Sequence, residues 1–185
     1  MREIFVSLDS RLRGRDGGDI LLGQNMSRWL ALSLLVIAID QAVKIWISSH
    51  FYYLESYTVT SFFNLVLWHN TGASFGMLNN AGGWQRWLFS AIAAVAAVWI
   101  IWLMRKHQHQ KLFCIGLVFI LGGAVGNLID RLSFGYVVDF LDFHLNDSHF
   151  AAFNVADSAI NIGAALLLWD SFKKKPEKEN ETATR

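Results

Sequence analysis

Charged residues, cysteine and proline are all scarce in this chain of 185 residues. Asp, Glu, Lys and Arg together make up 17% of it, whereas an ordinary soluble domain carries about 25%. This composition excludes a disordered chain, and a formal net charge of +1 excludes a strongly basic nucleic-acid-binding surface. The single cysteine, Cys114, excludes an intrachain disulfide.

Apolar residues are abundant instead, at 54% of the chain. A helix needs about 20 mostly apolar residues to cross a hydrocarbon core of about 30 Å. Four runs meet this need: residues 29–49, 87–104, 112–129 and 151–169. We therefore expect an all-α membrane protein with four transmembrane helices. The alternative of a cleaved secretory signal peptide fits the first run poorly, because that run is too long and contains both Asp and Lys.

The basic residues are distributed unevenly between the two sides of these runs. Residues 1–28, 105–111 and 170–185 carry five, three and five Lys or Arg residues, whereas residues 50–86 and 130–150 carry one each. Because cytoplasmic loops are rich in Lys and Arg, we expect both termini in the cytoplasm and the two long loops outside.

The first outer loop contains two segments, residues 53–59 and 62–68, that are rich in β-branched and aromatic residues. These segments predict short strands and hence a small β-rich region on the outer side. We expect residues 26–172 to form the four-helix domain. Residues 1–25 are expected to be a disordered or non-native extension, and residues 173–185 a disordered cytoplasmic tail.

The polar side chains within the apolar runs all fall near the outer ends of these runs. Such groups are costly inside a membrane and generally mark function. A transporter or channel would need polar residues through the full depth, or inverted repeats. One polar layer favours a site, although a non-enzymatic membrane scaffold remains an alternative. The layer contains Asp40, Lys44, Asn127, Arg131, Asn154, Asp157 and Asn161.

Carboxylates are the best candidates for chemistry in this layer. The sequence contains neither a GxSxG nor an HExxH motif, and His144 and His149 give only weak grounds for a zinc site. Two aspartates that share one proton can activate a water molecule and protonate a leaving amine. Asp157 is one candidate because it lies in an apolar run. Asp139 is the other, because its apolar neighbours favour desolvation.

Purely structural interpretations exist for several of these residues. Asp40 and Lys44 are four apart on one helix face and would neutralise each other. Arg131 would serve as an interfacial anchor that extends outward.

Other polar residues and two glycines also have structural interpretations. Asp130 and Asp142 would be solvated loop residues, and Asn161 would form an interhelical hydrogen bond. Gly122 and Gly126, four apart, predict close helix packing.

Five short motifs, in order along residues 26–172, resemble those of lipoprotein signal peptidase, also called signal peptidase II. This is a family of bacterial inner-membrane aspartyl proteases. The motifs are Asp40-Gln41-x-x-Lys44, Asn70-Thr-Gly72-Ala73-Ser-Phe, Gly122-Gly-Ala-x-Gly126-Asn127-x-x-Asp130-Arg131, Gly135-Tyr-Val-Val-Asp139-Phe and Phe153-Asn154-x-Ala156-Asp157-Ser.

The resemblance implies an activity and a set of roles. The family removes the signal peptide from diacylglyceryl-modified prolipoproteins by cutting on the amino side of the lipidated cysteine. Asp139 and Asp157 occupy the positions of the catalytic pair. The supporting residues would be Asn127, Arg131 and Asn154 for positioning, Asn70 for substrate backbone, and Asp40 and Lys44 for the structure of the site.

The resemblance further implies that neither a metal nor another cofactor is needed. The expected partners are prolipoprotein substrates and membrane lipid, with no nucleic acid. We expect a monomer, because one chain supplies both aspartates. The expected location is the bacterial inner membrane, with the site near the periplasmic face.

Overall fold

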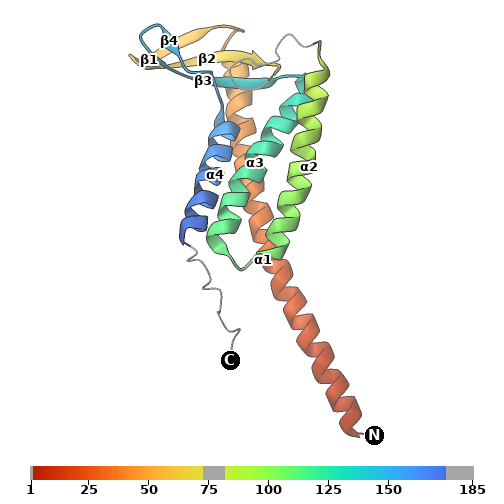
Figure 1. The fold of residues 1–185 in the computed structure, drawn as a ribbon. Coiled ribbons are helices and arrows are strands. Elements are labelled where there is room, and N and C mark those ends of the chain that lie inside the picture. Colours follow the sequence, from red (N-terminus) through yellow and green to blue (C-terminus); the bar gives the residue numbers. More distant parts are fainter. Residues whose placement is uncertain (1, 73–81, 174–185) are drawn as a thin grey trace, which may run out of the picture.

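The computed structural model describes residues 2–72 and 82–173, with side chains from Met26 onward. Four helices run side by side and a small sheet covers one end of them (Figure 1). The helices are α1 (Arg2–His50), α2 (Trp84–Lys106), α3 (Lys111–Phe134) and α4 (Val155–Lys173). The strands are β1 (Ser56–Thr60), β2 (Phe63–Asn70), β3 (Val137–Leu145) and β4 (Ser148–His149).

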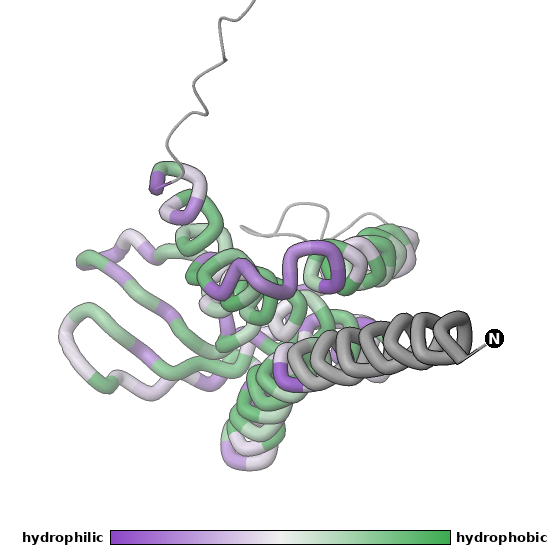
Figure 2. The backbone as a smooth tube through the Cα atoms, turned by 90° about the horizontal axis from the view of Figure 1, so that it is seen from below, coloured by the Kyte–Doolittle hydropathy of each residue, from purple (hydrophilic) through white to green (hydrophobic). Residues whose placement is uncertain are grey.

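Three helical segments are long and apolar enough to cross a membrane: Met26–His50 of α1, Trp84–Lys106 and Lys111–Phe134. Their apolar character is visible along the tubes of Figure 2. The fourth expected span, α4, is not among them, because Asp157, Asn161 and Asp170 lower its hydropathy. The protein is thus a mostly helical membrane protein, and its fourth span remains a prediction.

Two helix boundaries differ from those expected. α4 begins at Val155, so the first four residues of the expected run 151–169 precede the helix. α1 begins at Arg2 and includes residues 2–25, for which a disordered or non-native extension was expected. No proline interrupts this segment, and proline is the residue that most strongly ends a helix. The domain boundary at residue 26 remains a prediction.

The sheet has the strand order β1-β2-β3-β4, and each neighbouring pair is antiparallel. β1 and β2 confirm the two strands expected in the first outer loop. β3 and β4 lie within residues 130–150, where only a loop was expected. In the β2–β3 register Trp68 lies opposite Asp139, and Asn70 lies opposite Val137. The register therefore brings Asn70 close to Asp139.

Glycines in α3 allow its neighbours to approach closely. A Cβ atom added at Gly122 would lie 2.6 Å from the Cβ of Val36 on α1, and one at Gly126 would lie 2.6 Å from Oδ2 of Asp40. A Cβ atom at Gly123 would clash with the carbonyl oxygen of Ala156 at the start of α4. Close packing at Gly122 and Gly126 is thus confirmed.

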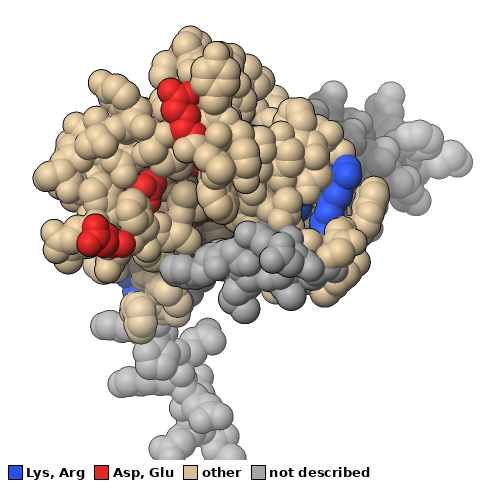
Figure 3. Space-filling model, turned by 90° about the horizontal axis from the view of Figure 1, so that it is seen from above, with Lys and Arg blue, Asp and Glu red and all other residues tan. Residues whose placement is uncertain are grey.

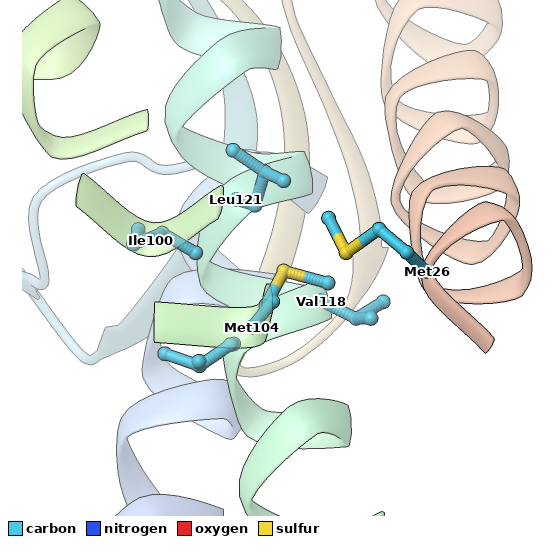
Figure 4. Packing of buried hydrophobic residues seen from close by; sticks show 6 residues of the cluster. Met26, Ile100, Met104, Val118 and Leu121 are labelled. Atoms are coloured by element: carbon cyan, nitrogen blue, oxygen red, sulfur yellow. The ribbon is translucent and has the colours of Figure 1, made fainter. Parts of the chain in front are cut away.

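Apolar packing predominates at the opposite end of the helices from the sheet. Side chains of α1, α2 and α3 meet there (Figure 4). Inside a membrane such contacts stabilise through close packing, since lipid is as apolar as the side chains. The buried residues of this cluster are Met26, Ile100, Met104, Leu117, Val118 and Leu121. The polar groups are therefore concentrated at the sheet end.

Candidate active site

Asp139 and Asp157 come together where β3 meets the start of α4. Asp139 is 1% exposed, whereas Asp157 is half-buried and lines a cavity of about 470 Å³. Asn154, which is fully buried, connects them. Its Nδ2 donates to Oδ1 of Asp139 at 2.7 Å, and its Oδ1 accepts from the backbone N–H of Asp157 at 2.9 Å. Both predicted aspartates thus contact Asn154 and lie at the same end of the molecule.

Each asparagine that contacts the aspartates is held in one orientation. An amide can turn over unless its oxygen faces a group that can only donate. For Asn154 that group is the N–H of Asp157. For Asn70 it is the N–H of Gly72, at 3.0 Å. Nδ2 of Asn70 therefore faces Asp139 and donates to its Oδ2 at 3.0 Å.

Asn127 is oriented by a charge. Lys44 donates from Nζ to Oδ1 of Asn127 at 2.9 Å, and an ammonium group can only donate. Nδ2 of Asn127 must then point the other way, and it donates to Oδ1 of Asp157 at 2.8 Å. Three predicted supporting residues, Asn70, Asn127 and Asn154, thus direct N–H groups at the two carboxyl groups.

Lys44 lies at the centre of a buried charge cluster. Its Nζ is 2.9 Å from Asp40 Oδ2 and 2.9 Å from Asp130 Oδ2, and the three side chains are at most 2% exposed. Asp40 also accepts from the N–H of Ala156 at 2.8 Å, which fixes the first turn of α4. Asp40 and Lys44 therefore form more than the simple intrahelical pair considered from the sequence.

Asp130 is not a solvated loop residue, so that expectation was wrong. The structure extends α3 to Phe134, with Gly135 in the left-handed conformation as its cap, and this places Asp130 inside the helix. Its carboxylate accepts from Gln41 Nε2 at 2.9 Å and from the N–H of Val138 at 3.1 Å. Asp130 thus holds the backbone immediately before Asp139.

Asp142 is also buried rather than solvated, at 7% exposure. It accepts from Asn64 Nδ2 at 3.0 Å, and His149 Nδ1 lies 2.9 Å from its Oδ2. It lines a second cavity of about 460 Å³ together with Asn70. Within residues 2–72 and 82–173 no group of three or more His, Cys, Asp or Glu residues could hold a metal ion.

Arg131 faces the site. Arg131 lines the same cavity as Asp157, and its guanidinium donates to the carbonyl oxygen of Gly72 at 3.3 Å. It also lies over the ring of Phe89, 5.3 Å from the centroid. These contacts tie Arg131 to the site, which the alternative of an outward-pointing anchor does not require. The remainder of the second motif, residues 73–75, lies outside the described residues.

The environment of Asp139 alters its acidity. Burial, and then the nearby charge of Asp157, raise the pKa of its carboxyl to about 7, against the opposing effect of the hydrogen bonds from Asn70 and Asn154. A carboxyl that titrates near neutrality is suited to proton transfer, and strongly shifted groups cluster at functional sites. The arrangement can therefore hold one proton between two carboxyl groups, one of which, Asp157, lines a cavity.

Comparison with known proteins places this geometry in a family. Residues 32–173 match the family model described as Signal peptidase (SPase) II. The chain belongs to the signal peptidase II family. It is therefore a membrane-embedded protease, which is a hydrolase. The resemblance inferred from the five motifs is confirmed.

Relatives of this signal peptidase II chain cover most of its length. It is 54% identical over 149 residues to "Lipoprotein signal peptidase" of Burkholderia multivorans, covering 80% of this chain and 90% of that protein. A protein of the same name from Burkholderia mallei is 50% identical over 152 residues, covering 82% and 92%. A solved bacterial membrane enzyme superposes with a TM-score of 0.73 at 26% identity, covering 85% of this chain and 95% of that one.

Proposed function

We propose that this signal peptidase II is an aspartyl endopeptidase that removes the signal peptide from diacylglyceryl-modified prolipoproteins. The cut falls on the amino side of the lipidated cysteine. The observation that carries the proposal is the pair Asp139 and Asp157, each held by asparagine N–H groups, with Asp157 lining a cavity. The relatives named lipoprotein signal peptidase support the same substrate class.

The proposed mechanism uses one proton shared by the two carboxyl groups. The ionised carboxylate takes a proton from a water molecule in the cavity, and the water oxygen attacks the scissile carbonyl carbon. The protonated carboxyl then gives its proton to the nitrogen of the lipidated cysteine as the C–N bond breaks. The pKa of Asp139, about 7, supports a pair that carries one proton near neutral pH. That proton belongs to the pair, because coupled groups titrate together.

The asparagines and Arg131 would hold this pair and the substrate in place. Fixed N–H donors favour the charged form of each carboxyl and prevent it from turning away from the water. Asn70 and Arg131 line the cavity, where the substrate backbone would lie. Asp40 and Lys44 would act indirectly: Lys44 fixes Asn127, and Asp40 fixes the start of α4.

The proposed placement is in the bacterial inner membrane with both termini cytoplasmic and the sheet end periplasmic. The sheet end shows few basic side chains (Figure 3), as expected for the outer side. We include α4 as the fourth span, since its 19 residues at 1.5 Å each reach about 28 Å. A monomer suffices, because one chain carries both aspartates and all three asparagines.

Cleavage of a synthetic prolipopeptide by the purified protein in detergent tests this function. The substrate is offered with and without the diacylglyceryl group, a chelator is present throughout, and products are identified by mass spectrometry. We expect cleavage of the lipidated peptide alone, at the bond preceding the modified cysteine. Equal cleavage of both peptides, or a cut elsewhere, would refute the substrate assignment. No cleavage of either peptide by folded protein would refute the proposed activity on prolipoproteins.

A further inference from the structure

Asn161 is a polar residue on α4 whose side chain the mechanism does not use. It lines the same cavity as Asp157, four residues further along the helix. Its Nδ2 donates to the backbone carbonyl oxygen of Asp157 at 3.0 Å, within its own helix, and the side chain is exposed. The interhelical hydrogen bond expected from the sequence was therefore wrong, and Asn161 needs another explanation.

The hydrogen-bonding capacity of Asn161 is largely unused. An amide has one acceptor oxygen and two N–H donors. Among the described residues, the one partner of this side chain is the carbonyl oxygen of Asp157. A polar group at membrane depth is costly unless it has a partner, and it generally faces a cavity that serves function. The free N–H of Asn161 is thus available to a ligand in the cavity.

The position of Asn161 indicates the part of the substrate that it would meet. Four residues of helix correspond to about 6 Å along the axis, away from the sheet. In the proposed placement the scissile bond lies at Asp157, so the substrate's glyceryl group and acyl chains would extend in this direction, toward the hydrocarbon. Ile160 and Phe153 line the same cavity and offer apolar contacts. Within the proposed placement, Asn161 lies at the depth of the glyceryl esters.

The charge of the cavity wall narrows the ligand class further. A neutral amide suits a neutral acceptor, and an ester carbonyl accepts hydrogen bonds without donating any. An anionic group would be drawn instead to Arg131, which lines the cavity near Asp157. We propose that Asn161 donates a hydrogen bond to an ester carbonyl of the substrate's diacylglyceryl group and thereby selects ester-linked lipid. This inference rests on the proposed function.

Two synthetic prolipopeptides that differ only in diester or diether linkage of the glyceryl chains test the assignment. The diether analogue lacks the carbonyl oxygens and keeps the chain lengths. The enzymes compared are wild type, Asn161→Leu, which removes the amide at similar volume, and the control Ile162→Ala. Ile162 is 49% exposed and outside the cavity lining. The detergent contains no ester, and a parallel series adds an ester phospholipid.

The wild type is expected to cleave the diester peptide with a kcat/KM about five- to tenfold above that of the diether peptide, as one hydrogen bond would give. Asn161→Leu is expected to lose this preference through a higher KM for the diester alone, and Ile162→Ala to keep it. An equal loss on both peptides, or none, would overturn the proposal. An effect of Asn161→Leu confined to samples with phospholipid would assign the residue to bilayer lipid and overturn it as well. If the wild type cleaves neither peptide, the proposed function itself fails.

Discussion

Replacement of Lys44 by methionine is expected to destabilise the protein strongly. Methionine has a similar length and no charge, so Asp40 and Asp130 lose the cation that lies 2.9 Å from each. Removing one partner of a buried ion pair costs about 3–5 kcal/mol, because an uncompensated charge stays buried. We therefore expect the free energy of unfolding to fall by about 3–5 kcal/mol. Unfolding in detergent, followed by circular dichroism, measures this change.

The same substitution is expected to impair catalysis through Asn127. Without Lys44, the oxygen of Asn127 keeps only the N–H of Asn154, at 3.2 Å, and its carboxamide can turn away from Asp157 more easily. We expect kcat/KM to fall at least about tenfold, the cost of a misplaced donor at a developing charge. Prolipopeptide cleavage at a temperature where Lys44→Met remains folded measures this loss separately from stability.

A neutral version of the cluster separates the two effects. In the triple variant Asp40→Asn, Lys44→Met, Asp130→Asn, no charge stays buried without a partner. Replacing a whole buried ion set by neutral groups is often close to neutral for stability. We expect this variant to regain most of the lost stability while cleavage stays slow. A Lys44→Met protein as stable as wild type, or a triple variant that cleaves at the wild-type rate, would refute the reasoning.

Three further predictions follow from the site and the helix packing. Because the pKa of Asp139 is raised to about 7, the folded protein binds more protons than the unfolded chain between its usual value of 3.8 and about 7. The free energy of unfolding should thus fall as pH rises through this window. Thermal unfolding measured at several pH values should show a smaller fall for Asp139→Asn than for the wild type. Asn154→Leu removes the donor to Asp139 at 2.7 Å, and should lower kcat by about 100-fold in the cleavage assay. Gly123→Ala places a Cβ atom against the carbonyl oxygen of Ala156, and should lower the free energy of unfolding by about 1–3 kcal/mol, whereas Ala124→Gly should not cause this clash.

The sequence was most informative where a polar residue interrupts an apolar run. Such a residue is costly in a membrane, so its position alone indicates a shared layer. Asn127, Asn154 and Asp157 were recognised in this way, and the structure brings them together. The strands at residues 53–59 and 62–68 were recognised because β-branched and aromatic residues favour extended backbone.

Contacts between distant segments could not be read from the sequence. Asp130 lies beyond the apolar run, so it looked like a loop residue, and only Gly135 indicated that the helix continues to Phe134. The burial of Asp142 depends on the pairing of β2 with β3, which places Asn64 opposite it. Asn154 three residues before Asp157 is the pattern of a helix cap, and it marks the true start of α4.

The most direct test of the account compares Asp139→Asn, Asp157→Asn and Asp142→Asn in one cleavage assay with a chelator present. Asparagine keeps the shape of aspartate but cannot take up or release the proton. The account predicts that kcat/KM falls at least about 100-fold in the first two variants. Asp142→Asn, the same change on the same strand, should keep at least about a tenth of wild-type activity. Unimpaired cleavage by Asp139→Asn or Asp157→Asn would contradict the two-aspartate mechanism.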